Sequence, residues 1–236
     1  MPTAWTTVWT CLEELVGMLP GCNVLVQAAT GGVGLVAVAY AQQTGAPMYA
    51  TAGRVEKQAF VQGLGVPLVS TTRDSTIFVA EMGSLMGSSG QLGLVLNSLT
   101  HGEYVREEAQ LLCKGGRFME IGKRGIWSRS QMSAVEQARY SVVAMDSQCS
   151  LDPAWQHAAL QSLNRRVAAA SQEVRPLTLH VFEFRSANVE AFRLLHRARQ
   201  IGKVVVSLED RNTSCTRGYG HRCTGPSGTG GLSLLV

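Results

Sequence analysis

The segment that most constrains the fold is a short apolar run, Asn23–Gln27, that leads into the turn Ala29-Thr30-Gly31-Gly32-Val33-Gly34. An alanine-rich stretch, Val33–Thr44, follows with the composition of a helix, and a second apolar run, Pro47–Ala52, comes after it. Strand, glycine turn, helix and strand in this order predict one βαβ unit. Backbone N–H groups at the start of such a helix bind phosphate, and glycine allows the anion to approach closely.

The turn is a variant of the dinucleotide fingerprint G-x-G-x-x-G. Gly31 and Gly34 stand at the two later glycine positions, whereas Ala28 or Ala29 stands at the first. A tight strand-to-helix turn of this kind also occurs in α/β proteins that bind nothing. The flanking strand and helix favour the fingerprint, because they supply the context that it requires. The predicted cofactor-binding residues of the turn are Thr30, Gly31, Gly32, Val33 and Gly34.

The choice of cofactor is read at the end of the second strand. NAD sites usually carry an acidic residue there, whereas NADP sites carry a basic one. This strand runs into Gly53 without an acid at its tip, and Arg54 and Lys57 lie just beyond it. Glu56 is expected to face solvent on the next helix. Solvated charges at a helix start are the alternative interpretation, but binding of the 2′-phosphate is favoured, and the predicted cofactor is NADPH.

Bulk properties exclude several classes of protein. The formal net charge is +4, and the 21 basic residues are scattered, so nucleic-acid binding is disfavoured. The first 19 residues lack a basic region and contain Glu13 and Glu14, which argues against a signal peptide. No apolar run reaches membrane-spanning length. The six cysteines show no C-x-x-C spacing, so we expect no metal site. A soluble protein in a reducing, cytoplasmic compartment is predicted.

Apolar runs alternate with helical patterns along the first 145 residues, which predicts the α/β class with a doubly wound parallel sheet, a Rossmann fold. The ligand should lie at the carboxyl edge of the strands. Expected strands are Asn23–Gln27, Pro47–Ala52, Leu68–Ser70, Gly93–Asn97, Arg117–Ile121 and Tyr140–Met145; expected helices are Val33–Thr44, Lys57–Leu64, Ile77–Met86 and Tyr104–Leu112.

The pattern changes after Met145. Pro153–Ala170 has helical spacing, with Trp155 expected in the core. A β-α-β piece follows, with a strand at Leu177–Phe184, a helix at Ala187–Ala198 and a strand at Gly202–Leu208. The stretch 209–236, rich in Gly, Ser, Thr and Arg, is expected to be a linker or a disordered end.

Five sequence blocks occur in an order typical of one enzyme family. The chain resembles the enoyl reductase domain of polyketide synthases and animal-type fatty acid synthases, within the zinc-free medium-chain dehydrogenase/reductase superfamily. The resemblance covers about residues 2 to 208. The blocks are the stretch from Thr3-Ala4-Trp5 onward, Ala29–Gly34, Val95–Leu99, Gly115–Lys123 and Arg199–Val205.

The resemblance implies NADPH-dependent reduction of the 2,3-double bond of an enoyl thioester on acyl carrier protein. Hydride goes to the β-carbon and a proton to the α-carbon. In that family, a lysine after one strand and an aspartate after the next are candidate proton donors, and they match Lys123 and Asp146. The chemistry also needs such groups, because hydride addition leaves an enolate. A surface lysine and a turn-capping aspartate are the alternative interpretations of this pair.

Four further residues are expected at the cofactor. Asn97 and Ser98 end the strand that lies over the cofactor in the family, and Gly122 precedes the lysine. Lys203 either touches the cofactor phosphate or extends along a sheet edge.

The domain arrangement is expected to be that of a megasynthase fragment. Residues 1–172 form the NADPH-binding domain, and residues 173–208 match the carboxyl-terminal return of the substrate-binding domain. Residues 209–236 contain Gly225–Leu232, which is similar to the glycine-rich opening of a ketoreductase. Relative to the family, the amino-terminal substrate-binding barrel is absent.

The expected partners are the carrier-bound enoyl thioester, neighbouring synthase domains and a second copy in a homodimer, with no nucleic acid and no membrane. The alternatives are a free-standing quinone-reductase-like oxidoreductase and a non-catalytic NADPH-binding module.

Overall fold

The computed structural model describes residues 2–71, 74–87, 90–99, 104–133, 138–169, 174–208 and 233–235. The chain divides into two compact units, Met1–Leu177 and Thr178–Val236. The sequence-based boundary at residue 172 lies slightly before this division.

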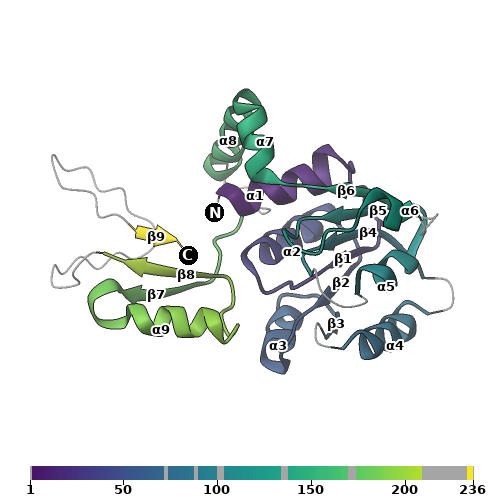
Figure 1. Cartoon of the computed structure of the whole chain (residues 1–236), viewed down its shortest axis with the longest axis horizontal. Coiled ribbons are helices and arrows are strands. Elements are labelled where there is room, and N and C mark those ends of the chain that lie inside the picture. Colours follow the sequence, from purple (N-terminus) through teal and green to yellow (C-terminus); the bar gives the residue numbers. More distant parts are fainter. Residues whose placement is uncertain are drawn as a thin grey trace. The chain divides into compact units, whose positions relative to one another are not determined.

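The first unit is built on one six-stranded sheet in which every pairing is parallel. The strand order is β3-β2-β1-β4-β5-β6 (Figure 1). This order reverses direction between β1 and β4, where doubly wound sheets bind their ligands. The predicted fold class is therefore confirmed. The strands are β1 Val24–Val26, β2 Met48–Thr51, β3 Leu68–Ser70, β4 Leu92–Asn97, β5 Leu112–Glu120 and β6 Ala138–Val142.

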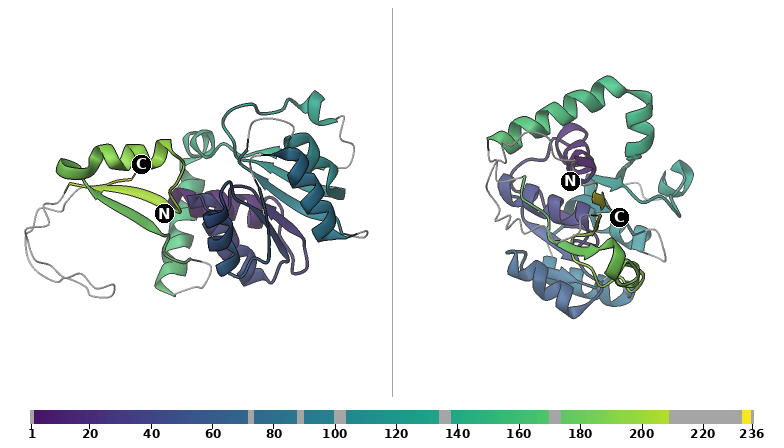
Figure 2. Two further views of the ribbon diagram at one scale, coloured as in Figure 1. Left: turned by 90° about the horizontal axis from the view of Figure 1, so that it is seen from below. Right: turned by 90° about the vertical axis from the view of Figure 1, so that its left-hand side faces the viewer.

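Helices cover both faces of this sheet, as the views in Figure 2 show. Side chains alternate across the strands, so Val24 and Val26 enter one core and Leu25 enters the other. The first core contains residues of α1, α2 and α8, and the second contains residues of α4 and α5. The helices of this unit are α1 Pro2–Trp9, η1 Thr10–Glu14, α2 Gly32–Thr44, α3 Val55–Gly63, α4 Ser75–Met86, α5 Tyr104–Gln110, α6 Arg129–Ser133, α7 Met145–Leu151 and α8 Pro153–Ala168.

Among the element boundaries that differ from the prediction, two bear on the site. The strand expected over Tyr140–Met145 ends at Val142, and Met145 begins α7. Asp146 therefore lies in the first turn of a helix, where the helix dipole favours an acid. Leu112, predicted to end a helix, begins β5 instead. The pair Gly115-Gly116 interrupts the strand pattern there and conceals its beginning.

An aromatic stack joins α1 to α8. The rings of Trp5 and Trp9 lie 5.7 Å apart and nearly parallel, and Trp9 lies 6.3 Å from Trp155. The indole nitrogen of Trp155 donates to both oxygens of Glu14, at 3.0 and 3.2 Å. Trp155 is half-buried rather than part of the core, because this hydrogen bond keeps one edge of its ring at the surface.

The second unit contains β7 Leu179–Glu183, α9 Phe184–His196, β8 Lys203–Ser207 and β9 Ser233–Leu235. Strand β7 pairs parallel to β8, which confirms the β-α-β prediction, and β9 pairs antiparallel to β8. The tail was expected to be unstructured, but residues 233–235 form this strand, with Leu234 opposite Val206 and Leu235 opposite Val205. Residues 209–232 lie outside the described residues.

Within the described parts of both units, no helix combines the length and apolarity that a membrane crossing requires.

Candidate functional site

The glycine turn is closed by tight packing between backbone segments. A Cβ placed on Gly34 would lie 2.6 Å from Cα of Ala29 and 2.7 Å from the carbonyl oxygen of Ala28. Both neighbours are backbone atoms, which cannot move aside. A Cβ on Gly31 would lie 3.3 Å from the same carbonyl oxygen. Gly34 therefore allows α2 to begin against the end of β1, as the last glycine of the fingerprint does.

Ala28 carries the conformation that usually selects glycine. Its φ is +49°, in the left-handed region. Its N–H donates to the hydroxyl of Thr51 at 3.1 Å, and the N–H of Ala29 donates to the carbonyl oxygen of Thr51 at 2.9 Å. These bonds tie the turn to the end of β2. They compensate for the left-handed backbone, which costs about 1–2 kcal/mol in a residue with a Cβ.

The start of α2 fits an anion. Gly31 is the N-cap and provides no side chain to satisfy the first helical N–H groups. Gly31 is exposed and Gly32 and Val33 are half-buried, so these N–H groups lie at the surface. Thr30, by contrast, is buried. Because α2 has 13 residues, its dipole adds to the attraction for a phosphate.

The basic residues after β2 lie where the sequence placed them. Arg54 is the N-cap of α3, and both Arg54 and Lys57 are half-buried. Glu56 is exposed in the first turn of α3, as expected. The strand tip itself carries no acid.

Lys123 and Asp146 come together although they follow different strands. The Nζ atom of Lys123 lies 2.8 Å from Oδ2 of Asp146. Their side chains are 75% and 65% exposed. The hydrogen bond from Lys123 holds the pKa of Asp146 below its ordinary value, and the backbone N–H of Ser147 and the charge of Lys123 act in the same direction. Asp146 is thus a carboxylate at neutral pH.

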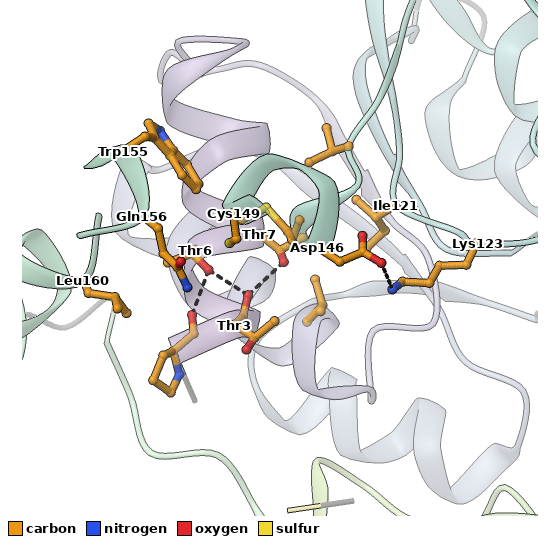
Figure 3. Close-up of a pocket in the computed structure, with 14 residues that line it drawn as sticks. Thr3, Thr6, Thr7, Ile121, Lys123, Asp146, Cys149, Trp155, Gln156 and Leu160 are labelled. Atoms are coloured by element: carbon orange, nitrogen blue, oxygen red, sulfur yellow. Dashed lines mark hydrogen bonds and ion pairs between the residues drawn. The ribbon is translucent and has the colours of Figure 1, made fainter. Parts of the chain in front are cut away.

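A pocket of about 550 Å³ lies beside this pair (Figure 3). Val33 places the glycine turn in its wall, and Lys123 and Asp146 form another part of it. The hydroxyl groups of Thr6 and Thr7 donate to helix carbonyl oxygens at 2.8–3.1 Å, so only their lone pairs are left for a ligand. The complete lining is Pro2, Thr3, Thr6, Thr7, Val33, Ile121, Lys123, Val143, Met145, Asp146, Cys149, Trp155, Gln156 and Leu160.

The other predicted cofactor residues differ in burial and in hydrogen-bond partners. Asn97 is fully buried, and its amide bonds to Leu99 and Glu120 rather than pointing outward. A direct contact of this amide with a cofactor is therefore disfavoured. Ser98 and Gly122 are half-buried. Lys203 belongs to β8 of the second unit, so its predicted phosphate contact stays a prediction.

Sequence reasoning missed two sets of residues. One is the pocket wall formed by the threonines of α1 and by Trp155 of α8, because no strand or glycine signal marks Pro2–Trp9 and the helical spacing placed Trp155 in the core. The other is a buried polar cluster at the strand ends. Glu120 interrupts an apolar run, Phe118–Ile121, and such an isolated acid is a signal that could have identified it.

Potential metal ligands do not gather at one place in the described ranges. No group of three or more His, Cys, Asp or Glu side chains within these ranges could hold a metal ion. Cys11, Cys22, Cys113 and Cys149 are free thiols. Burial raises the pKa of Cys11 to about 12, so this thiol is unreactive.

Comparisons with known proteins agree with this geometry. A family model described as zinc-binding dehydrogenase matches residues 64–206. The described residues do not fit the zinc of that name. A phenolphthiocerol/phthiocerol polyketide synthase of Mycobacterium tuberculosis is 37% identical over 208 residues, which are 87% of this chain and 9% of that protein.

Two solved structures are similar to the chain. The nucleotide-binding subdomain of the enoylreductase domain of PpsC from Mycobacterium tuberculosis is 35% identical with a TM-score of 0.65, over 74% of this chain and 96% of that one. The quinone oxidoreductase of Thermus thermophilus, also solved in complex with NADPH, is 31% identical with a TM-score of 0.68, over 87% and 64%.

The chain thus spans about a tenth of the polyketide synthase that it matches and nearly all of one crystallised nucleotide-binding subdomain. With its 3-2-1-4-5-6 sheet and glycine turn, it belongs to the zinc-binding dehydrogenase family and, within it, to the enoyl reductase domains of polyketide synthases.

Proposed function

We propose that the chain binds NADPH at its glycine turn and takes part in reducing the 2,3-double bond of an enoyl thioester carried on acyl carrier protein. The observation that carries this proposal is the Lys123–Asp146 ion pair in a pocket that reaches Val33 of the turn. The NADPH complex of the related quinone oxidoreductase supports the choice of cofactor, as do Arg54 and Lys57 after β2.

The chain's own residues have separate parts in this reaction. The N–H groups at the start of α2 bind the pyrophosphate, and Arg54 and Lys57 bind the 2′-phosphate. NADPH, when bound, supplies the hydride that reaches the β-carbon of the substrate. Lys123 places a positive charge at the thioester oxygen, where the enolate develops negative charge.

The ion pair supports a narrower proposal for the proton donor than the two candidates that the sequence offered. Asp146 is a poor acid, because its lowered pKa keeps it a carboxylate. We therefore assign the proton that reaches the α-carbon to the ammonium group of Lys123. Asp146 orients that group through the 2.8 Å contact. Both side chains are exposed, so water restores the proton after each turnover.

Turnover of crotonyl thioester with NADPH tests this proposal. Lys123→Ala should lower kcat roughly a hundredfold, the usual scale of general acid catalysis. Asp146→Asn should lower it less, because the lysine remains. Both variants should keep the wild-type stability, since the pair is exposed. Lys114→Ala, an exposed lysine at the opposite end of β5, is the matched control and should be neutral. Unchanged turnover in Lys123→Ala would contradict the assignment.

The two alternatives can be separated with the same protein. Similarity to a quinone oxidoreductase favours testing a quinone substrate in parallel. Faster reduction of the quinone than of the thioester would support that activity. Binding of NADPH with turnover of neither substrate would support a non-catalytic module.

The cytoplasmic location and the homodimer stay predictions. Sedimentation equilibrium measures the oligomeric state directly.

A further inference from the structure

Five polar side chains are buried together where the strands end toward the site. Each is at most 3% exposed: Gln27, Thr51, Asn97, Glu108 and Glu120. Two of them are carboxyl groups. The ion pairs between described residues, Lys123–Asp146 and Arg166–Glu13, include neither of these two carboxyl groups. Burying two carboxylates without a counter-charge is costly, and one of them is expected to keep its proton.

Glu120 has the hydrogen-bond pattern of a carboxylate. Its Oε1 accepts the backbone N–H of Gly122 at 2.6 Å, and its Oε2 accepts Nδ2 of Asn97 at 2.7 Å. Asn97 in turn closes the turn after β4 by bonding to the N–H and the carbonyl oxygen of Leu99. Both oxygens thus accept N–H donors. Burial raises the pKa of Glu120, but the bonds from Gly122 and Asn97 act in the opposite direction, so these two donors favour the ionised form.

Glu108 lacks the pair of N–H donors that Glu120 has, so its ionised form is less well supported. Its Oε1 accepts Nε2 of Gln27, whose own Oε1 accepts the hydroxyl of Thr51. Its Oε2 has no hydrogen-bond partner in the described part of the chain. Burial raises the pKa of Glu108 well above its ordinary value, and the charge of Glu120 adds to this.

Among the described residues, the other ionisable groups that interact with Glu108 or Glu120 are Glu107 and Tyr104 on α5 and Tyr140 on β6, and none of these three is a cation.

We propose that Glu120 is a positioning residue, a buried carboxylate that fixes the Gly122–Lys123 turn, and that Glu108 stays protonated beside it and fixes Gln27. Within the described residues, no hydrogen bond or ion pair joins the side chains of Glu120 and Lys123, so Glu120 acts through the backbone N–H of Gly122. Its effect on turnover rests on the proposed function, whereas its protonation state does not.

The substitutions E120Q and E108Q offer a matched test, because each removes one carboxyl group with the same change of shape. In E120Q an amide NH₂ replaces one accepting oxygen and faces an N–H donor. The Gly122 amide resonance should shift, and kcat should fall roughly ten- to a hundredfold through misplacement of Lys123. In E108Q the acceptor for Gln27 is kept and an N–H replaces the O–H. The Gly122 amide resonance should therefore stay at its wild-type position, and kcat should stay within about twofold of the wild-type value.

Carbon-13 labelling of the glutamate side chains in the wild-type protein measures protonation without any variant. Near neutral pH, Glu108 should give the shift of a protonated carboxyl and Glu120 that of a carboxylate. Reversed shifts, or two carboxylates, would overturn the charge assignment. A Gly122 resonance and a kcat that are the same in E120Q as in wild type would overturn the positioning role. A wild-type protein without enoyl turnover would contradict the proposed function, and the resonance data would still decide on Glu120.

Discussion

The glycine turn and the Lys123–Asp146 pair border the same pocket but are built in opposite ways. The turn is made of backbone in close contact, with Gly34 packed against Ala29. The ion pair consists of two exposed side chains on separate segments, and the pair itself adds little to stability. The proposed cofactor half of the site is therefore part of the fold, whereas the proposed reacting half consists of side chains on its surface.

The largest expected effect breaks the turn. Gly34→Val forces a side chain into the backbone of Ala29 and should lower the free energy of unfolding by about 3 kcal/mol, with loss of NADPH binding. Urea denaturation measures this. The control is Gly83→Ala in α4, where nothing lies within 4 Å; it should instead gain about 0.5–1 kcal/mol. Equal effects at the two positions would show that the turn is not tightly packed.

The second-largest expected effect concerns the preference for NADPH over NADH. Arg54→Ala should weaken NADPH binding roughly tenfold or more and leave NADH binding unchanged, because charge-assisted bonds to the 2′-phosphate are lost. Fluorescence titration with both nucleotides measures this. Arg106→Ala, an exposed arginine on α5, serves as the control. A parallel loss of affinity for both nucleotides would show that Arg54 supports the fold and not the phosphate.

Unfolding measured over a range of pH tests the raised pKa of Glu108 in the buried polar cluster. Glu108 ionises in the unfolded chain near its ordinary pKa of 4.5, whereas burial raises its pKa in the folded protein. Between these two values the folded state holds the extra proton, so Glu108 lowers stability progressively as pH rises. The free energy of unfolding of E108Q relative to wild type should therefore increase from about pH 5 upward. A difference that is flat with pH would mean that the pKa of Glu108 is not raised.

The smallest expected effect comes from relieving the backbone strain at Ala28. Ala28→Gly should raise the free energy of unfolding by about 1 kcal/mol, because Ala28 has a φ of +49°. Ala29→Gly should lower it by a similar amount, since Ala29 lies outside the left-handed region. Thermal unfolding distinguishes the two variants, and a loss of stability in both would show that the left-handed backbone of Ala28 costs less than the added flexibility of glycine.

The parts of the molecule that follow a local pattern could be predicted from the sequence. The βαβ unit around Gly31 and the parallel sheet depend on hydrophobic periodicity and on turn residues. Both signals lie within short stretches of sequence. Lys123 and Asp146 were expected near each other, after adjacent strands, although their ion pair was not predicted. The helix that carries Asp146 was not expected, because Val142 and Val143 continue the strand pattern and only tertiary packing ends it.

The buried polar layer could not be predicted in this way. Glu108 lies in α5, far in sequence from Gln27, and each looks like a surface residue within its own segment. Their contact depends on how α5 packs on the sheet. The pocket wall at Thr3 and Trp155 has the same origin, because α1 and α8 meet only in the folded chain.

The measurement that tests the central claim most directly is a fluorescence titration of NADPH into the wild-type chain and into Lys123→Ala. If the cofactor half is part of the fold and independent of the exposed pair, both proteins should bind NADPH with a micromolar Kd, equal within about twofold. Absence of binding up to about millimolar NADPH, or loss of binding in Lys123→Ala, would contradict it.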